Sequence, residues 1–253
     1  MSQQRKLAVA ILAAGQGKRM GNPNIAKVLT PLCGKPLLGY VLEQSSELHP
    51  TAIVVIVGHQ RDAVKSYVQD VAPNAQCVIQ DQQLGTGHAV LQTAPVLATQ
   101  DVDVIILSGD VPLLSSATLR ALVNRHQTTG AVATVLSAQV PNPTGYGRIV
   151  RDEHGVLLRI VEHKDATENE REISEINSGI YVVQSTHLFA ALDRVENGNV
   201  QGEFYLTDII GILQHDGLLV DAWCGPVWEE LHGINTTSDL ERAEQILEAR
   251  SLV

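Results

Sequence analysis

The segment Leu7-Ala-Val-Ala-Ile-Leu-Ala-Ala-Gly-Gln-Gly-Lys-Arg-Met20 joins an apolar run to a loop that carries two glycines and two cations. An unbroken apolar run such as Leu7–Leu12, followed by a glycine-rich turn, is typical of a strand buried inside a sheet. Glycines directly after such a strand let backbone N–H groups approach an anion closely. The segment therefore predicts a buried strand with an anion-binding loop at its carboxyl end.

Two better-known phosphate loops do not fit this segment. The dinucleotide pattern G-x-G-x-x-G needs a glycine at position 20, where Met20 stands, and an acid after the second strand, where Gly58 and His59 stand. The Walker A pattern is not completed either. What remains is a loop with two cations, Lys18 and Arg19, and a further Lys27 shortly after, a group that suits the charge of a triphosphate. The alternative is that these are solvated loop charges, since exposure is the default state of Lys and Arg.

The rest of the chain alternates between apolar runs and helical periodicity. Strands are expected at 7–12, 53–57, 104–107 and 131–136, and helices at 36–45, 62–68, 87–97 and 116–126. This order favours a mostly parallel sheet covered on both faces, with ligands beyond the carboxyl ends of its strands. Further on we expect a hairpin within 145–161, a charged loop or helix at 165–172, a strand at 180–183, a helix at 205–214, a strand at 218–222 and a closing helix at 238–249.

The composition argues against several classes of function. The 18 Lys and Arg against 28 Asp and Glu give a net charge of -10, which is unfavourable for non-specific nucleic-acid binding. The three cysteines are far apart and form no Cys-x-x-Cys pair, so a zinc site or disulfide framework is not expected. Residues 7–12 are too few for a signal-peptide core, and no membrane-length apolar stretch follows. We therefore expect a soluble, cytoplasmic protein without a nucleic-acid or membrane partner.

A carboxylate directly follows the expected middle strand. In Asp103-Val-Ile-Ile-Leu-Ser-Gly-Asp-Val-Pro112, Asp110 would lie at the mouth of the sheet as a ligand for a hard cation such as Mg²⁺. The alternative is a helix N-cap, but Ser115 and Ser116 are better placed for that role. No His-Glu-x-x-His and no Gly-x-Ser-x-Gly occurs, so zinc hydrolysis and serine esterase chemistry have no support.

With these residues in place, the chain resembles the uridyltransferase domain of N-acetylglucosamine-1-phosphate uridyltransferases along almost its whole length. The motifs that carry the resemblance are residues 12–20, Lys27-Val-Leu29, Gln83-Leu-Gly-Thr-Gly-His-Ala89, Gly109-Asp-Val-Pro-Leu113, Pro143-Thr-Gly-Tyr-Gly-Arg148, Val161-Glu-His-Lys-Asp165, Glu175-Ile-Asn177, Gly233-Ile-Asn235 and Gly202-Glu-Phe-Tyr-Leu-Thr-Asp208. It implies an α/β, Rossmann-like nucleotidyltransferase (GT-A-like) fold with a mixed, mostly parallel central sheet and a small sugar-side β subdomain. Residues 1–253 would form one domain, with a nucleotide-binding part at about 1–138, a sugar-binding part at 139–235 and a closing helix at 236–253.

The resemblance also implies the residues of the site. Arg19, Lys27 and Asp110 would be catalytic, and Asp110 with Asn235 would bind Mg²⁺. The substrate-binding set would be Leu12, Ala13, Ala14 and Gly15 for uracil and ribose, Lys27 for phosphate, Gln80, Gly85 and Thr86 for the uracil ring, Ser108 and Gly109 near the nucleotide, Gly147, Glu162 and Asn177 for the sugar, and Asn235.

Four of these assignments have a structural alternative. Gln80 would be a surface residue at a strand end, Glu162 a partner of Lys164 or Arg148, Asn177 a turn residue, and Asn235 a helix N-cap.

The implied reaction transfers a uridylyl group from UTP to N-acetylglucosamine 1-phosphate and releases pyrophosphate, by Mg²⁺-dependent in-line displacement. No base is required because a phosphate oxygen is already a nucleophile, so catalysis would rest on positioning and charge neutralisation. Two alternatives stay open: a related enzyme that uses glucose 1-phosphate or dTTP, and a non-catalytic nucleotide-sugar binding module. Intact Arg19, Lys27 and Asp110 argue against the latter.

The chain departs from the family pattern at three points. Ala26 stands where proline is usual, and Ser108 where an aromatic residue is common. Many family members continue into a left-handed β-helix that acetylates glucosamine 1-phosphate, and its hexapeptide repeats do not occur in this sequence. Since that domain usually supplies the trimer contact, we expect no acetyl transfer and a monomer or weak dimer.

Overall fold

The structure is a computed structural model, and it describes residues 5–17, 25–225 and 227–251. Its central strand, β1 (Lys6–Ala13), pairs in parallel with β4 (Ala52–Val57) on one side and with β6 (Val102–Ser108) on the other. Val9 and Ile11 are fully buried on one face and Ala10 on the other. Coverage of both faces explains the unbroken apolar run, and the three strands predicted here are confirmed.

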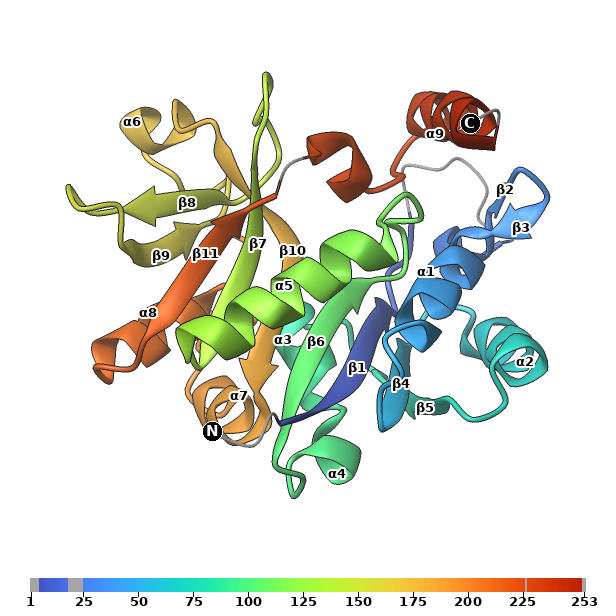
Figure 1. The fold of residues 1–253 in the computed structure, drawn as a ribbon, viewed down its shortest axis with the longest axis horizontal. Helices are drawn as coiled ribbons and strands as arrows, with labels where there is room; N and C mark the ends of the chain where they lie inside the picture. Colours follow the sequence, from blue (N-terminus) through green and yellow to red (C-terminus); the bar gives the residue numbers. More distant parts are fainter. Residues whose placement is uncertain (1–4, 18–24, 226, 252–253) are drawn as a thin grey trace.

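The main path of the sheet runs in the order β11-β7-β10-β6-β1-β4-β5 (Figure 1). Its other members are β5 (Gln76–Ile79), β7 (Ala133–Gln139), β10 (Glu175–Gln184) and β11 (Val220–Cys224). Strand β10 is antiparallel to both neighbours, whereas the other four pairings along the path are parallel, so the predicted mixed, mostly parallel sheet is confirmed. Strand β5 was not expected, because it is a short edge strand that begins with a polar residue.

The hairpin predicted within 145–161 consists of β8 (Arg148–Arg151) and β9 (Leu157–Val161). In its turn, Asp152 Oδ1 accepts hydrogen bonds from the backbone N–H groups of His154 and Val156, at 2.9 and 2.8 Å. Strand β8 also pairs with β10, so the hairpin branches from the main sheet. The residues just before β8 thus lie beside β10, and those just after β9 lie on the other side of β8.

Helices cover both faces of the sheet. They are α1 (Leu37–Ser46), α2 (Arg61–Val71), α3 (Thr86–Leu91), α4 (Ala94–Leu97), α5 (Ser116–Thr129), α6 (Glu168–Arg171), α7 (Ser185–Leu192), α8 (Asp208–His215) and α9 (Thr237–Ser251). One core cluster joins α1, α2 and α5 to Val9 and Ile11 of β1, and the other joins α3, α7 and α8 to Ala8 and Ala10. The short elements are η2 (Lys27–Leu29), β2 (Pro31–Leu32), β3 (Lys35–Pro36) and η3 (Trp228–Leu231).

The helices differ from expectation in two places. The single helix expected at 87–97 is split into α3 and α4 because Pro95 has no N–H to continue the hydrogen-bond pattern, and the Thr93 hydroxyl donates to the carbonyl of Val90 at 2.7 Å. Helix α7 was not predicted, although its buried residues Ser185, Leu188, Phe189 and Leu192 follow the helical spacing i, i+3, i+4, i+7. No helix of the described part of the chain combines the length and the apolar character that crossing a membrane requires.

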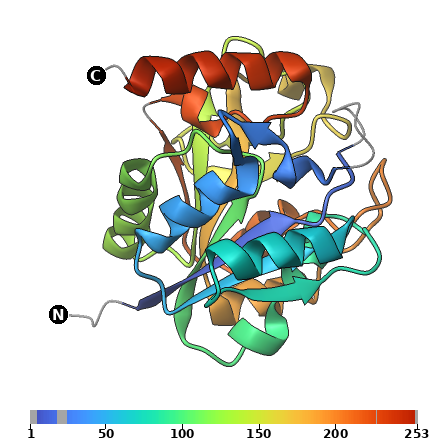
Figure 2. The ribbon, with the colours of Figure 1, turned by 90° about the vertical axis from the view of Figure 1, so that its right-hand side faces the viewer.

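The helix predicted at 238–249 is α9, which lies along one end of the molecule (Figure 2). It covers a small third core in which Leu32, Leu37, Leu113 and Ile234 pack against Ala243. This contact fixes the chain that leads into α9, including the turn just before it.

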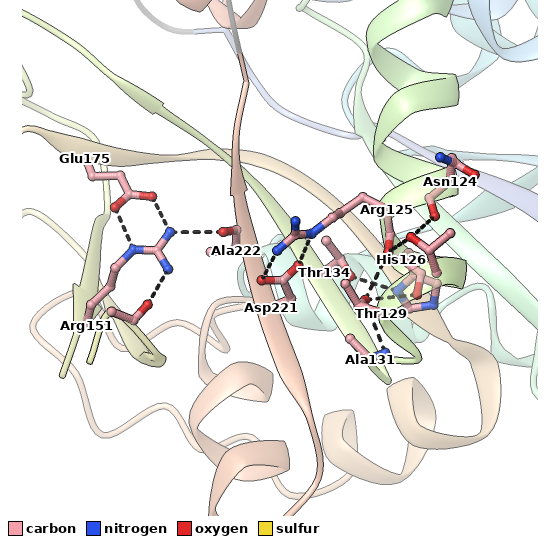
Figure 3. A network of polar contacts seen from close by, with 12 residues as sticks. Asn124, Arg125, His126, Thr129, Ala131, Thr134, Arg151, Glu175, Asp221 and Ala222 are labelled. Carbon is pink, nitrogen blue, oxygen red and sulfur yellow. Dashed lines mark hydrogen bonds and ion pairs between the residues drawn. The ribbon is translucent and has the colours of Figure 1, made fainter. Parts of the chain in front are cut away.

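A buried carboxylate ties the strands of the second half together (Figure 3). Glu175 on β10 accepts two hydrogen bonds from Arg151 on β8, at 2.7 and 2.8 Å, and one from the Ser137 hydroxyl on β7, at 2.5 Å. Arg151 also donates to the carbonyl of Ala222 on β11, at 3.0 Å. Burial raises the pKa of Glu175, but the hydrogen bonds from Arg151 and Ser137 and the charge of Arg151 outweigh it and hold the pKa below its usual value.

We predict that Glu175→Gln lowers the free energy of unfolding by about 2 kcal/mol at pH 7, because Arg151 then lacks its countercharge. A carboxyl whose pKa is lowered by folding stabilises the fold above its unfolded pKa, about 4.3, and this stabilisation is lost as the pH falls through the folded value. The gap between wild type and variant should therefore shrink below about pH 4 in urea unfolding curves.

Asp101→Asn is the matched control. It removes the carboxylate from an ion pair with Arg5 in which the Asp101 side chain is 77% exposed. This variant should unfold like the wild type, because exposed pairs contribute little. Equal destabilisation in both variants would contradict a structural role for the buried network.

Candidate active site

A cleft of about 850 Å³ opens at the carboxyl ends of β1, β5 and β6. Eleven residues predicted for the site line it: Leu12, Ala13, Ala14, Gly15, Lys27, Gln80, Gly85, Thr86, Ser108, Asp110 and Asn235. Seven further lining residues were not assigned from the sequence: Gln16, Gly17, Val28, Asp81, Gln83, Ala89 and Glu203. Most of these seven lie inside or beside quoted motifs, so the motifs were their available signal. Arg19 lies outside the described residues.

Close packing shapes the loop after β1. The Ala14 carbonyl accepts hydrogen bonds from the His59 N–H at 3.2 Å and from the Gln83 amide at 3.0 Å. Gly17 has φ +60°, and a Cβ there would lie 2.5 Å from the Cβ of Lys27. Glycine is therefore required at position 17 both for its backbone conformation and for space.

A second wall of the cleft is formed by the loop after β5. Gln80 is only 3% exposed, and its amide donates to the Gly85 carbonyl at 3.0 Å, so it is not a surface residue. Gly85 has φ +115°, and a Cβ there would lie 2.5 Å from the carbonyl oxygen of Phe204. The Thr86 hydroxyl accepts a hydrogen bond from the Leu206 N–H at 3.0 Å. Residues 203–206 thus pack against this loop and hold it in position.

A cationic centre lies at the floor of the cleft. Lys27 Nζ donates to Asp110 Oδ2 and, at 2.8 Å, to Asn235 Oδ1. The side chains of Lys27 and Asp110 are 12% and 22% exposed, so the pair is partly shielded from water. The N–H of Ile234 donates to the Asp110 carbonyl at 2.9 Å, which holds the two segments together. Lys27 therefore reaches both side chains at the cleft floor, although Ala26 stands before it where proline is usual in the family pattern.

Two of the structural alternatives fail at this centre. Helix α5 is capped by Ser115, whose hydroxyl accepts from the Thr118 N–H at 3.2 Å, so Asp110 is not its N-cap. Before α9, the Thr236 hydroxyl accepts from the Asp239 N–H at 3.2 Å, while the Asn235 side chain faces Lys27. Both side chains are thus available to the cleft.

The three residues predicted for the sugar also come together, although they do not line this cleft. A Cβ on Gly147 would lie 3.5 Å from both Glu162 Oε1 and Asn177 Cβ, and the Asn177 N–H donates to the Gly147 carbonyl at 2.9 Å. Asn177 does sit at a turn-like bulge, where its side chain accepts from the Gly179 N–H at 3.0 Å. Gly109 packs against Leu12, whose carbonyl accepts from its N–H at 2.9 Å.

Glu162 faces a second hollow of about 410 Å³ together with Asp165, Thr207 and Asp208. Its partner is the Thr207 hydroxyl, at 3.2 Å, and not Lys164 or Arg148. Burial raises the pKa of Glu162, and the charges of Asp208 and Asp165 add to this, against the hydrogen bond from Thr207. Burial and the charge of Asp165 raise the pKa of Asp208 to about 6. These three carboxylates make the second hollow acidic, whereas Lys27 places a positive charge in the first cleft.

Comparisons with known proteins agree with this arrangement. The Bifunctional protein GlmU of Thermobifida fusca (strain YX) is 45% identical over 256 residues, covering 100% of this chain and 53% of that protein. The Bifunctional protein GlmU of Geobacillus thermodenitrificans (strain NG80-2) is 47% identical over 247 residues, covering 97% of this chain and 52% of the relative. The chain thus spans about half the length of these curated relatives. Matches along the whole chain confirm the resemblance that the motifs indicated.

Solved structures and a family model complete the comparison. The crystal structures of UDP-glucose pyrophosphorylase, complexed with UDP-glucose and apo, have TM-scores of 0.78 and 0.79 at 17% identity, covering 97% of this chain and 99% of theirs. At this identity the likeness shows the fold alone, and it confirms the predicted Rossmann-like nucleotidyltransferase fold. The MobA-like NTP transferase domain matches residues 9–195. Because this match spans well over half of the sequence, the chain belongs to the MobA-like NTP transferase family.

Proposed function

We propose that the chain transfers a uridylyl group from UTP to N-acetylglucosamine 1-phosphate, giving UDP-N-acetylglucosamine and pyrophosphate. The observation that carries the proposal is the convergence of the glycine-rich loop, the Gln80–Thr86 loop, and Lys27 with Asp110 and Asn235 on one cleft. Whole-chain identity of 45% and 47% to proteins named Bifunctional protein GlmU supports it, as does the resemblance of the motifs to the uridyltransferase domain.

The proposed donor site lies between the two loops. Backbone groups of residues 12–15 and the loop 80–86 would hold uracil and ribose, with Ser108 and Gly109 beside them. A base edge is recognised by hydrogen bonds, and rigid backbone groups present these without an ordering cost. The packing of residues 203–206 against Gly85 and Thr86 supports this role, because it fixes the loop in the absence of a ligand.

The donor set at the cleft floor fits Mg²⁺. Asp110 and Asn235 would hold the ion, since carboxylate and amide oxygens are hard ligands of the kind it prefers. No group of three or more His, Cys, Asp or Glu side chains that could hold a metal occurs in the described part of the chain. The remaining ligands would thus come from water and from substrate phosphates, which is usual for Mg²⁺. When bound, the ion would neutralise charge on the triphosphate.

The proposed acceptor site is built from Gly147, Glu162 and Asn177. A carboxylate and an amide offer acceptors and donors to sugar hydroxyls, and glycine leaves room for the ring. We infer that residues 1–138 serve mainly the nucleotide, residues 139–235 mainly the sugar, and residues 236–253 close the domain. The first two parts meet where the Ile234 N–H donates to the Asp110 carbonyl and Lys27 donates to Asn235, which supports this division.

The chemistry then requires alignment and charge balance. The acceptor's phosphate oxygen would attack the α-phosphorus of UTP in line with the leaving pyrophosphate. Arg19 and Lys27 would stabilise negative charge on the phosphates as it shifts to the leaving group. Holding both substrates in this geometry removes much of the entropic barrier. No covalent bond to the protein is needed.

We further propose a cytoplasmic monomer or weak dimer without nucleic-acid or membrane partners. The net charge of -10 supports the exclusion of nucleic acid, because the phosphate backbone would be repelled. Sedimentation of the purified chain would establish its oligomeric state.

We predict that the purified chain releases pyrophosphate from UTP when N-acetylglucosamine 1-phosphate and Mg²⁺ are both present. A panel of sugar phosphates against UTP, dTTP, ATP and GTP, followed by a coupled pyrophosphate assay, measures this. The expected pair should exceed every other pair by about tenfold or more, since recognition by hydrogen bonds penalises a missing group.

The other outcomes are distinct. Equal or better turnover with glucose 1-phosphate or dTTP would assign the chain to a related transferase instead. Nucleotide-sugar binding in calorimetry without any pyrophosphate release would favour a binding module.

A second prediction concerns the cationic centre. Because the Lys27 ammonium is bonded to both proposed metal ligands, it competes with a free divalent ion. Lys27→Met should bind Mn²⁺ about tenfold more tightly than the wild type in the absence of nucleotide, as read by electron paramagnetic resonance. UTP binding should weaken in the same variant, because a phosphate contact is lost.

Lys35→Met is the matched control, since Lys35 pairs with Glu43 and lies over the Tyr40 ring. It should leave Mn²⁺ affinity unchanged. Unchanged Mn²⁺ affinity in Lys27→Met as well would show that the ammonium does not occupy the metal ligands in solution.

A further inference from the structure

Three side chains outside the cleft form a continuous hydrogen-bonded chain. Tyr146 Oη lies 3.0 Å from His232 Nδ1, and His232 Nε2 lies 3.0 Å from Asp239 Oδ1. The other oxygen of Asp239 accepts from the N–H groups of Asn235 and Thr236, at 2.9 and 2.8 Å. The hydrogen-bonded chain thus runs from the loop before β8 to the turn before α9, and its link between Tyr146 and His232 spans 86 residues of sequence.

The contacts of Asp239 set the direction of the hydrogen bonds at its end of the chain. Its Oδ2 accepts from two backbone N–H groups, and its Oδ1 faces His232 Nε2 as a further acceptor. His232 Nε2 must then carry a proton to donate to Asp239, and in the Nε2–H tautomer Nδ1 is an acceptor. Burial raises the pKa of Tyr146, so its hydroxyl keeps a proton to donate. The Nε2–H tautomer of His232 matches both neighbours.

The two ends of the chain adjoin the two halves of the proposed site. Tyr146 directly precedes Gly147, which lies against Glu162 and Asn177. At the other end, Asp239 holds the backbone of Asn235, whose side chain accepts from Lys27. The link therefore joins the sugar side to the cation side without contacting the cleft itself.

Packing holds the middle residue in place. The rings of His232 and Trp228 meet edge to face with centroids 6.4 Å apart, and Arg242 lies over the Trp228 ring at 5.0 Å. An imidazole fixed on one side by an aromatic ring and on two edges by hydrogen bonds has little freedom to turn. This rigidity suits a spacer between two loops.

We propose that Tyr146, His232 and Asp239 act as a positioning relay that sets the acceptor-sugar loop relative to the turn that carries Asn235. The relay rests on the proposed function and adds three residues to it. Its purpose is alignment, because in-line transfer is sensitive to displacements of about 1 Å between reacting groups. None of the three is a catalytic residue.

The kinetic test interrupts the hydrogen-bonded chain at Tyr146 or at His232. Tyr146→Phe and His232→Gln should each raise KM for N-acetylglucosamine 1-phosphate about fivefold, while the Kd for UTP changes less than twofold. The double variant should be no worse than His232→Gln alone, since that variant has already lost the bond that Tyr146→Phe removes. Additive losses, or equal losses for both substrates, would overturn the relay.

Tyr40→Phe is the matched control. The Tyr40 hydroxyl donates to the Leu32 carbonyl at 2.8 Å, so this variant also loses one phenol hydrogen bond near α9. It should leave the KM for the sugar phosphate at the wild-type value. A KM increase equal to that of Tyr146→Phe would show a general effect of packing and would overturn the proposal.

A spectroscopic test separates the relay from the proposed function. Two-bond ¹⁵N–¹H spectra of histidine should show His232 as the neutral Nε2–H tautomer in the wild type, with an Nδ1 resonance that moves in Tyr146→Phe. The Nδ1–H tautomer, or no movement, would overturn the relay even in an active enzyme. Absence of pyrophosphate release with this signature intact would instead remove the proposed reaction.

Discussion

The parallel pairing of β1 with β4 on one side and β6 on the other is the constraint on which the rest of the structure depends. Parallel strands end at the same edge, so the loops after β1 and β6 emerge side by side. The register is fixed because alternate residues of β1 enter different cores, and a slip by one residue would exchange the faces. Just beyond the end of β6, the Gly109 N–H still donates a hydrogen bond to the Leu12 carbonyl on β1, at 2.9 Å. The alignment of these two strands therefore positions the residues at the floor of the cleft.

An acidic chain has to concentrate positive charge where phosphate is to be bound. Within the described residues, Lys27 places a positive charge at the cleft floor, where its ammonium is paired with Asp110. The carboxylates of Glu162 and Asp208 lie in the second hollow. Asp110 and Asn235 meet Lys27 across 83 and 208 residues of sequence, so the centre exists only in the folded chain.

The sequence predicted those parts that depend on local pattern. Strands β1, β4 and β6 were predictable because full burial demands unbroken apolar runs, and the Ser115 cap because its chemistry is local. Pro95 was a local signal for the split between α3 and α4, but the apolar periodicity around it led to the prediction of a single helix.

Long-range contacts were beyond such reasoning. The grouping of the site residues came from the family resemblance and not from spacing. The link between Tyr146 and His232, 86 residues apart, had no local signal at all, because either side chain alone is an ordinary polar residue.

Gly17 shows how tightly the loop and the cationic centre share space. A Cβ at this position would lie 2.5 Å from the Cβ of Lys27, closer than two such atoms can approach. A substitution at Gly17 would therefore affect the glycine-rich loop and Lys27 at the same time. Any other residue at position 17 would disturb the loop conformation and the reach of the ammonium together, and no change in the lysine side chain beyond Cβ could relieve the clash. This corner of the protein should tolerate far less sequence drift than the apolar strand that leads into it, where one aliphatic residue can replace another.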